Sequence, residues 1–287
     1  MRRESPADQA APLLRSGTRL PIKVPPSGPL YEGHFPGRPI LPGVGLLHLA
    51  LRALAAAGAP PALREIVALR LRRLVAPGDV LELEVQALDP DGRARLEVRR
   101  AAEVVANGVV LLGEPSSGTD AAAPTREPPS AAGRTVLARG PRRSSGVPDL
   151  DDLLPQRPPM RFVAGIETEM EDGVVCAVRL PQQSAFTERG SAPALVTLEM
   201  AAQSAAAFEA LRRIRAGGKA GARVGYLVGA RDVRFARARM PAGKTLSAAV
   251  RLQGIALPLC TYAFDVAREG EVVASGTVST WLTATGA

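Results

Sequence analysis

The sequence has 287 residues, of which 46% are hydrophobic and 22% are charged, so it is long enough for one large domain or two ordinary ones. Its formal net charge of +8 comes almost wholly from arginine. This excess fits either a GC-rich genome or a surface that attracts an acidic partner, whereas no aromatic-studded basic stretch argues for nucleic acid. The first residues lack the apolar core of a signal peptide and no apolar run is long enough to span a membrane, so we expect a cytoplasmic protein without membrane contact.

Both histidines of the chain lie in one stretch, residues 31–50, which reads YEGHFPGRPILPGVGLLHLA. His34 precedes a segment rich in proline and glycine, which excludes a helix interior or a central strand. A Pro-Gly pair then opens an apolar helix from Val44 to about Ala57. The sequence therefore places His34 on a rigid loop beside the amino end of a buried helix, where free backbone N–H groups can polarise a carbonyl.

Strand patterns surround this helix in the first half of the chain. In LELEVQAL, leucine, valine and alanine alternate with polar residues, which is the period of a half-buried strand. Pro-Gly-Asp, Pro-Asp-Gly and Asn-Gly sequences separate the runs, as an antiparallel meander requires. The expected strands cover residues 18–24, 64–75, 80–88, 93–100 and 103–112.

Three segments divide the chain. Residues 18–112 form the first predicted domain, and residues 113–148, which are rich in Ser, Gly, Pro, Ala and Arg without periodicity, form a flexible linker. Residues 149–287 form the second domain and repeat the order of elements, with a helix over about 194–215. Its expected strands cover residues 161–169, 173–180, 226–239, 245–257, 260–268 and 271–282. An internal duplication explains this repetition.

Aligning the two helices compares the chemistry of the halves. Glu199 falls at the level of His48, and Ala185 falls at the level of His34. The second half has therefore lost the histidine but carries a carboxylate, and Gln203 lies one turn beyond Glu199 on the same helix face. An unpaired carboxylate in an otherwise apolar helix is costly, which favours a functional role for Glu199.

The stretch GHFPGRPILPGV resembles the signature of the (3R)-hydroxyacyl-acyl-carrier-protein dehydratases, which have the hotdog fold. TLEMAAQ resembles the helix motif of the same family, and LLPQRPPMRF resembles its amino-terminal motif, with Gln156 where the family usually has histidine. The resemblance implies an α+β double hotdog, with two antiparallel sheets each wrapped round a central helix and paired as a pseudo-dimer. It is similar to a dehydratase fused to its partner from aryl-polyene clusters.

In this family each site takes a histidine from one subunit and a carboxylate from the central helix of the other. The resemblance thus implies one composite site, in which His34 is the general base and Glu199 the general acid. The other crevice receives His48 and Ala185, which cannot do the same work. The expected reaction converts a (3R)-3-hydroxyacyl thioester to a trans-2-enoyl thioester in fatty-acid-like or polyene biosynthesis. Apolar neighbours of Glu199 would favour its protonated form.

The resemblance also implies the surroundings of this site. A helix-start N–H at Gly43 or Ala194 would polarise the thioester carbonyl, and Gln203 and Phe35 are further candidate substrate-site residues. The substrate would be carried on the phosphopantetheine of an acidic acyl carrier protein, with no metal or redox cofactor. Beyond the intramolecular pseudo-dimer, two chains could also pair as a homodimer, which the sequence leaves open.

Two other functions remain open from the sequence. A hotdog thioesterase can use a helix glutamate with water as nucleophile, although it would not need the histidine motif. A non-catalytic scaffold that binds acyl carriers would explain the altered positions His48, Ala185 and Gln156. Cys176 and Cys260 lie in apolar, strand-like contexts and are expected to be buried free thiols.

Overall fold

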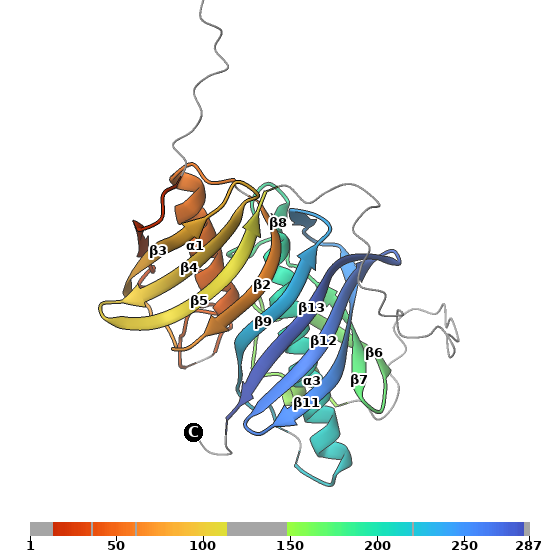
Figure 1. The fold of residues 1–287 in the computed structure, drawn as a ribbon. Helices are drawn as coiled ribbons and strands as arrows, with labels where there is room; N and C mark the ends of the chain where they lie inside the picture. The colour runs from red at the N-terminus through yellow and green to blue at the C-terminus, as the bar shows by residue number, and fades with distance from the viewer. Residues whose placement is uncertain (1–13, 36, 61, 114–147, 220, 284–287) are drawn as a thin grey trace, which may run out of the picture.

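The computed structural model describes residues 14–35, 37–60, 62–113, 148–219 and 221–283 (Figure 1). Nearly all of the expected linker, residues 113–148, lies outside the described residues. The first half of the chain contains five strands and one long helix in the expected order. They are β1 (Thr18–Lys23), α1 (Gly43–Ala56), β2 (Leu63–Leu71), β3 (Val80–Leu88), β4 (Arg93–Arg100) and β5 (Glu103–Leu112).

The second half repeats this order with additional short elements. Its central helix, α3 (Thr197–Arg215), is preceded by one turn of 3-10 helix, η1 (Ala194–Val196). Before them come α2 (Leu150–Leu153), β6 (Val163–Glu169), β7 (Gly173–Arg179) and β8 (Ser191–Pro193). After them come β9 (Gly225–Phe235), β10 (Arg239–Pro241), β11 (Thr245–Ala256), β12 (Leu259–Arg268) and β13 (Glu271–Leu282).

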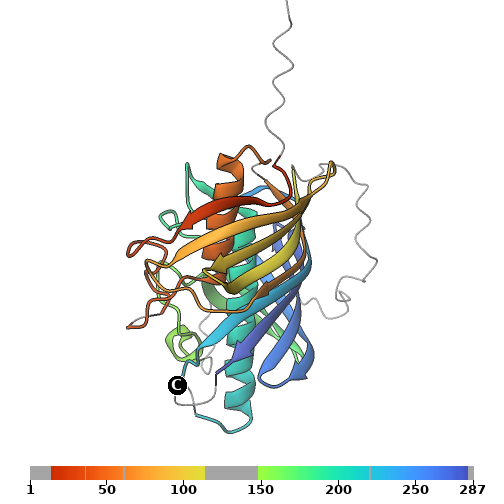
Figure 2. The same cartoon turned by 60° about the vertical axis from the view of Figure 1, so that its left-hand side comes forward.

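The strands of both halves join in one eleven-stranded antiparallel sheet. Its order is β1-β3-β4-β5-β2-β9-β13-β12-β11-β7-β6, so the two halves meet where β2 pairs with β9. On either side of this junction the strands follow an equivalent order, with β2, β5, β4 and β3 matching β9, β13, β12 and β11. Figure 2 shows α1 and α3 on the same side of the curved sheet. The structure is thus a double hotdog whose two sheets are continuous.

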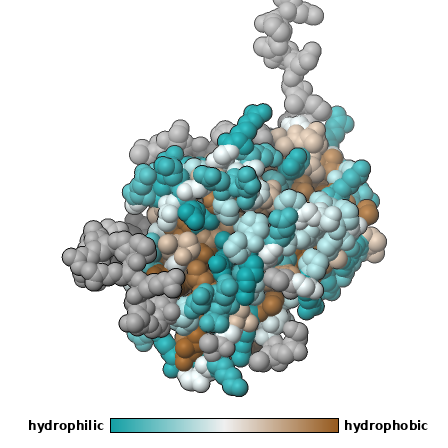
Figure 3. Space-filling view, turned by 180° about the vertical axis from the view of Figure 1, so that it is seen from behind, coloured by the Kyte–Doolittle hydropathy of each residue, from teal (hydrophilic) through white to brown (hydrophobic). Residues whose placement is uncertain are grey.

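One hydrophobic core connects the two halves. A single cluster of buried side chains includes Val44 and Leu46 of α1 as well as Leu195 of η1 and Leu198 of α3. The alternation expected in LELEVQAL is observed at Leu81, Leu83 and Val85 of β3, which are buried. It ends at Ala87, which is exposed and follows a register shift against β4. Cys176 and Cys260 are both buried free thiols, as predicted. The face seen in Figure 3, opposite to the view of Figure 1, shows hydrophobic patches between hydrophilic residues.

Three elements differ from the sequence-based expectation by three or more residues at one end, whereas the other bounds differ by at most two. The strand expected over 64–75 ends at Leu71, because the N–H groups of Arg72 and Arg73 both turn to the carbonyl of Val105. The strand expected over 226–239 ends at Phe235, and β10 instead pairs with β8 in a separate two-stranded sheet. The helix expected from Ala194 begins with a 3-10 turn before it becomes α-helical. Among the described residues, no helix is long and apolar enough to cross a membrane.

Candidate active site

His34 is held in a compact loop between β1 and α1. Its backbone N–H donates to the carbonyl of Tyr31 at 3.0 Å, and its Nδ1 lies 3.2 Å from the carbonyl oxygen of Ile40. Since a carbonyl oxygen can only accept, Nδ1 carries the proton in this arrangement. The other ring nitrogen, Nε2, is then left with its lone pair, as a general base requires.

The environment of His34 favours the neutral imidazole. The side chain is only 7% exposed, and burial lowers the pKa of His34 below its ordinary value of 6.5. The nearby Glu199 carboxylate and the bond to Ile40 act in the opposite direction but are smaller effects. A histidine with a lowered pKa is unprotonated near neutral pH, so His34 is available to take a proton.

Glu199 lies in the first turn of α3, and Gln203 holds its carboxylate. Gln203 Nε2 donates to Glu199 Oε1 at 3.0 Å and to the carbonyl of Met160 at 2.8 Å. Gln203 Oε1 in turn accepts from the backbone N–H of Phe162 at 2.8 Å. The Gln203 side chain is fully buried, and these bonds fix the orientation of its amide. The fixed amide in turn orients the Glu199 carboxyl group.

The two candidate catalytic residues line one cavity. It has a volume of about 850 Å³, and its wall contains His34, Gly43, Gln156 and Glu199. Along α3 the cavity continues past Ala202, Ala205 and Ala206. His34 comes from the first half and Glu199 from the second, so the cavity is built at the junction of the halves. The electrostatic effect of Glu199 on His34 is consistent with this proximity.

The two candidate N–H donors differ in availability. The N–H of Ala194 donates to the carbonyl of Ala238 at 2.9 Å and is therefore already occupied. Gly43 lines the cavity and begins α1, whose amino end has Pro42 as its N-cap residue and no side-chain cap. The first N–H groups of an α-helix have no partner within the helix. Gly43 rather than Ala194 therefore offers a free N–H to the cavity.

The structure also places two other residues that the sequence analysis named, Phe35 and His48. Phe35 stacks on the His34 ring at a centroid distance of 4.2 Å, and the peptide bond between the two residues is cis. His48, in contrast, packs edge-to-face on Phe186 at 5.6 Å. Its nearest charged groups are Arg52, Glu188 and Arg239, and burial lowers the pKa of His48 as well. His48 thus packs against an aromatic ring and lies outside the cavity that His34 and Glu199 line.

A loop of the second half supports the histidine loop of the first half, which sequence reasoning missed. The N–H of Arg157 donates to the carbonyl of Gly33 at 3.0 Å. Gly33 has a φ of +80°, and a Cβ added there would lie 2.0 Å from the Arg157 carbonyl oxygen. The QRPPMRF motif that contains Arg157 was recognisable in the sequence, but its contact with the other half depends on the tertiary fold.

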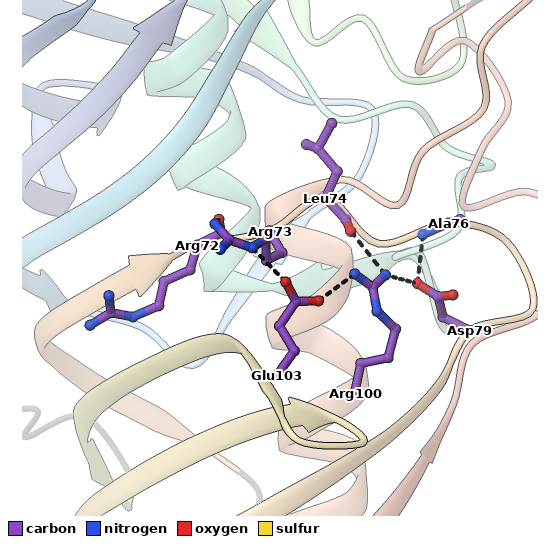
Figure 4. Close-up of polar contacts among 7 residues, drawn as sticks. All are labelled: Arg72, Arg73, Leu74, Ala76, Asp79, Arg100 and Glu103. Atoms are coloured by element: carbon purple, nitrogen blue, oxygen red, sulfur yellow. Dashed lines mark hydrogen bonds and ion pairs between the residues drawn. The ribbon is translucent and has the colours of Figure 1, made fainter.

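An ion-pair network holds the segment after β2, which borders the same cavity (Figure 4). Arg100 bonds both Asp79 and Glu103 at 2.7 Å, and Glu103 also bonds Arg73 at 2.6 Å. The segment so fixed contains Val75, whose carbonyl accepts from the N–H of Leu41 at 2.8 Å. Leu41 follows Ile40, whose carbonyl binds His34, so the network supports the position of His34 through the backbone.

The cavity rim is basic. Arg70, Arg72 and Arg73 line the cavity and are exposed to solvent. The Arg72 guanidinium is turned away from the acidic residues of the network (Figure 4), and its Nε donates to Asn107 Oδ1 at 3.1 Å. Over the part of the chain that is described, no group of three or more His, Cys, Asp or Glu residues could hold a metal ion.

Comparisons with known proteins identify relatives of each half. A family model described as ApeI dehydratase matches residues 15–109, and one described as ApeP dehydratase matches residues 148–285. The 3-hydroxyacyl-(acyl-carrier-protein) dehydratase FabZ of Chloroflexus aggregans is 46% identical over 70 residues, which cover 20% of this chain and 46% of the relative. FabZ of Caldicellulosiruptor saccharolyticus is 32% identical over 95 residues, which cover 29% of this chain and 68% of the relative. The chain spans about half the length of the first curated relatives that it matches.

Solved structures share the fold across nearly the whole chain. The dehydratase domain of PpsC from Mycobacterium tuberculosis has a TM-score of 0.63 at 18% identity, with 95% of this chain and 99% of that chain covered. A bifunctional dehydratase-cyclase domain in ambruticin biosynthesis has a TM-score of 0.59 at 19% identity, with coverages of 94% and 92%. These structures show the shared fold. The FabZ relative of which 68% is covered, together with the family matches of the two halves, shows that the chain belongs to the hotdog-fold 3-hydroxyacyl-(acyl-carrier-protein) dehydratases, as a fusion of an ApeI-like and an ApeP-like domain.

Proposed function

We propose that the protein dehydrates (3R)-3-hydroxyacyl thioesters to trans-2-enoyl thioesters, with His34 as general base and Glu199 as general acid. The observation that carries the proposal is that one cavity is lined by a buried imidazole with a free Nε2 and by a buried carboxyl group. Each half contributes one of the two groups. General acid and general base catalysis by positioned side chains is the chemistry that this pair can provide.

Each residue has a defined proton to move. His34 Nε2 takes the proton from C2, and that electron pair forms the C2–C3 double bond as the C3–O bond breaks. Glu199, in its protonated form, gives its proton to the departing hydroxyl, which leaves as water. His34 is then protonated and Glu199 ionised, and return of one proton from His34 to Glu199 restores the starting state. Gln203 keeps the carboxyl group in place during this cycle.

The Gly43 N–H has a role at the thioester carbonyl. Negative charge develops on the carbonyl oxygen as C2 loses its proton, and an N–H donor at the start of a helix stabilises it. Gly43 is favoured for this role because it lines the cavity at the start of α1, whereas the N–H of Ala194 already donates to the carbonyl of Ala238. The alanines of α3 then give the acyl chain a path past Glu199 inside the same cavity.

The carrier of the substrate is proposed to be an acidic acyl carrier protein. The exposed arginines of the rim, above all Arg72, suit the phosphate of a phosphopantetheine arm and an acidic surface beside it. The fused ApeI-like and ApeP-like domains favour a place in polyene or fatty-acid-like synthesis. The site residues require no metal for the two proton transfers, which stays a prediction.

The test is an assay with a 3-hydroxyacyl thioester and with its enoyl product. Reversible change of enoyl absorbance supports a dehydratase, release of free thiol indicates a thioesterase, and neither reaction indicates a scaffold. His34→Ala and Glu199→Gln should each lower kcat by about 10²- to 10⁴-fold, because each removes one proton transfer. His48→Ala is the matched control, since His48 is also 7% exposed but lies in the other crevice, and its turnover should be that of the wild type.

A further inference from the structure

Along α3 the catalytic cavity ends at a second acidic residue, Glu209. Its wall follows the helix from Glu199 past Ala202, Ala205 and Ala206 to Glu209. At a rise of about 1.5 Å per residue, the helix covers about 15 Å between the two carboxylates. A single lipid chain occupies about the same length, which is half of the hydrocarbon thickness of a bilayer at about 30 Å. The path along α3 can therefore hold a long acyl chain, but not one of unlimited length.

Two partners hold the Glu209 carboxylate in place. The Tyr262 hydroxyl, on β12, donates to Oε1, and Arg212 Nη2 donates to Oε2 at 2.9 Å. Tyr262 is fully buried, and burial raises the pKa of its hydroxyl, which therefore keeps the proton that it donates. Because each carboxylate oxygen has its own donor, Glu209 has a fixed position at the end of the cavity. Its side chain is still 10% exposed, so it is accessible from the space that it lines.

A second cavity, of about 460 Å³, continues along the last turns of α3. Four residues belong to the walls of both cavities, namely Ala206, Glu209, Gly225 and Leu282. The second cavity opens to solvent at Leu257, which is 73% exposed. Space for a longer chain is thus present, and Glu209 belongs to the boundary between this space and the catalytic groups.

Contact with Glu209 is unfavourable for the end of an alkyl chain. A carboxylate that is covered by an apolar group loses its contact with water, and this costs free energy unless new hydrogen bonds replace the water. A terminal methyl group forms no such bond. A shorter chain, in contrast, lies beside the small side chains of Ala202, Ala205 and Ala206 and leaves the carboxylate uncovered.

We propose that Glu209 is a specificity-determining residue, which sets the upper length of the acyl chain. This inference rests on the proposed function, because reaction beside His34 and Glu199 fixes where the chain begins. Alkyl chains that end before Glu209 are dehydrated efficiently. Longer chains would have to cover the carboxylate to enter the second cavity, and they are therefore poor substrates.

The first measurement is kcat/KM for a series of unbranched 3-hydroxyacyl-coenzyme A thioesters, from 3-hydroxybutyryl to 3-hydroxyicosanoyl. In the wild type, kcat/KM should fall by at least about tenfold once the chain is longer than the path to Glu209, which corresponds to the cost of covering one polar group. Equal kcat/KM for the longest chains and for those of intermediate length would overturn the inference.

The second measurement removes the charge and its buried partner together. Glu209→Leu combined with Tyr262→Phe leaves no buried hydroxyl without a bond, so the fold should be kept. The ratio of kcat/KM for the longest chain to that for the shortest should rise by at least about tenfold, because an apolar boundary no longer opposes entry into the second cavity. Tyr262→Phe alone is the matched control. It keeps Glu209 and should keep the ratio of the wild type.

Misfolding cannot imitate this result, because misfolding does not improve the use of one substrate over another. Glu209→Gln is a second variant that retains an acceptor for Tyr262, and it should raise the same ratio by a smaller factor, since an amide is less costly to cover than a carboxylate. An unchanged ratio in Glu209→Gln and in the double variant would overturn the inference.

Binding separates this inference from the proposed function. Saturated acyl-coenzyme A thioesters cannot be dehydrated, and their dissociation constants from calorimetry should show the same length limit and its relief in the double variant. If no substrate is turned over but this limit is found, the proposed function fails and Glu209 still ends the path of the chain. If turnover occurs and neither rates nor dissociation constants depend on Glu209, the inference alone fails.

Discussion

At the scale of single residues, the pairing of His34 with Glu199 depends on neighbours that fix both side chains. The Ile40 carbonyl sets the tautomer of His34, and Gln203 sets the position of the Glu199 carboxyl group. Each helper is buried or part of the backbone, so neither requires ordering when substrate binds. In the proposed function, the positions of both groups are thus set before the substrate binds.

The pH dependence of kcat/KM follows from the lowered pKa of His34. Only the neutral imidazole can take the C2 proton, and burial places its pKa below 6.5. We expect kcat/KM to fall on the acid side with a midpoint below pH 6.5, measured from initial rates of enoyl formation. A midpoint above 6.5 would mean that the His34 ring is more solvated, or more strongly paired with Glu199, than the structure shows.

At the scale of elements, the histidine loop is positioned by contact with the second half. Gly33 approaches the Arg157 backbone so closely that no Cβ fits, whereas a Cβ on Gly37 would meet no atom within 4 Å. Both glycines have similar backbones, with φ of +80° and +78°. An alanine at either position would have to adopt a left-handed backbone, which destabilises the folded state by about 1–2 kcal/mol in both cases.

These two glycines therefore give a matched pair of variants. Gly37→Ala should lose only the stability that the left-handed backbone costs and should keep nearly normal turnover. Gly33→Ala should lose more stability and at least about tenfold in kcat/KM, because the clash with Arg157 displaces the loop that carries His34. Urea unfolding and initial rates measure both effects. Equal behaviour of the two variants would show that the Gly33–Arg157 contact does not position the loop.

Much of the element order was predictable from the sequence because alternation, turn residues and helix periodicity act locally. The bounds of β3, β4 and β5 match the expected ranges. Alignment of the two halves placed Glu199 at the level of His48, where the first half has no carboxylate. Contacts between distant segments were not predictable in this way. The Arg157–Gly33 bond and the early end of β2 each depend on a partner far away in the chain.

The candidate site was predictable in part, since its two proton-transfer residues came from motif resemblance and from the alignment of the halves. The choice between Gly43 and Ala194 was not, because the N–H of Ala194 is occupied by a carbonyl that follows β9. The role of Gln203 was open for the same reason. Its partners, Met160 and Phe162, belong to a loop about forty positions earlier in the chain.

At the scale of the whole molecule, the two fused halves together supply one histidine and one carboxylate to a shared cavity. The sheet is continuous across the β2–β9 junction and the core is shared, so the halves act as one unit. His48, which the alignment of the halves places at the level of Glu199, packs on Phe186 and lies outside the cavity that His34 and Glu199 line. The protein is thus expected to have one working site per chain.

Moving a carboxylate into the second crevice tests this asymmetry. His48→Glu in a Glu199→Gln background should remain inactive, because Ala185 supplies no base to the new acid. Circular dichroism should first show that the variant is folded, since a carboxylate buried beside Phe186 destabilises the native state. Recovered dehydration in this double variant would mean that the second crevice has a base that the described residues do not reveal.

The most direct measurement is the kcat of His34→Ala, Glu199→Gln and the double variant under one set of conditions. If both groups act on one substrate, each single variant is nearly inactive and the double variant is about as slow as the slower single one, because residues that act as a unit have non-additive effects. If instead each single variant kept about half of the wild-type rate and only the double variant lost activity, the two residues would serve separate sites and the shared site would be refuted.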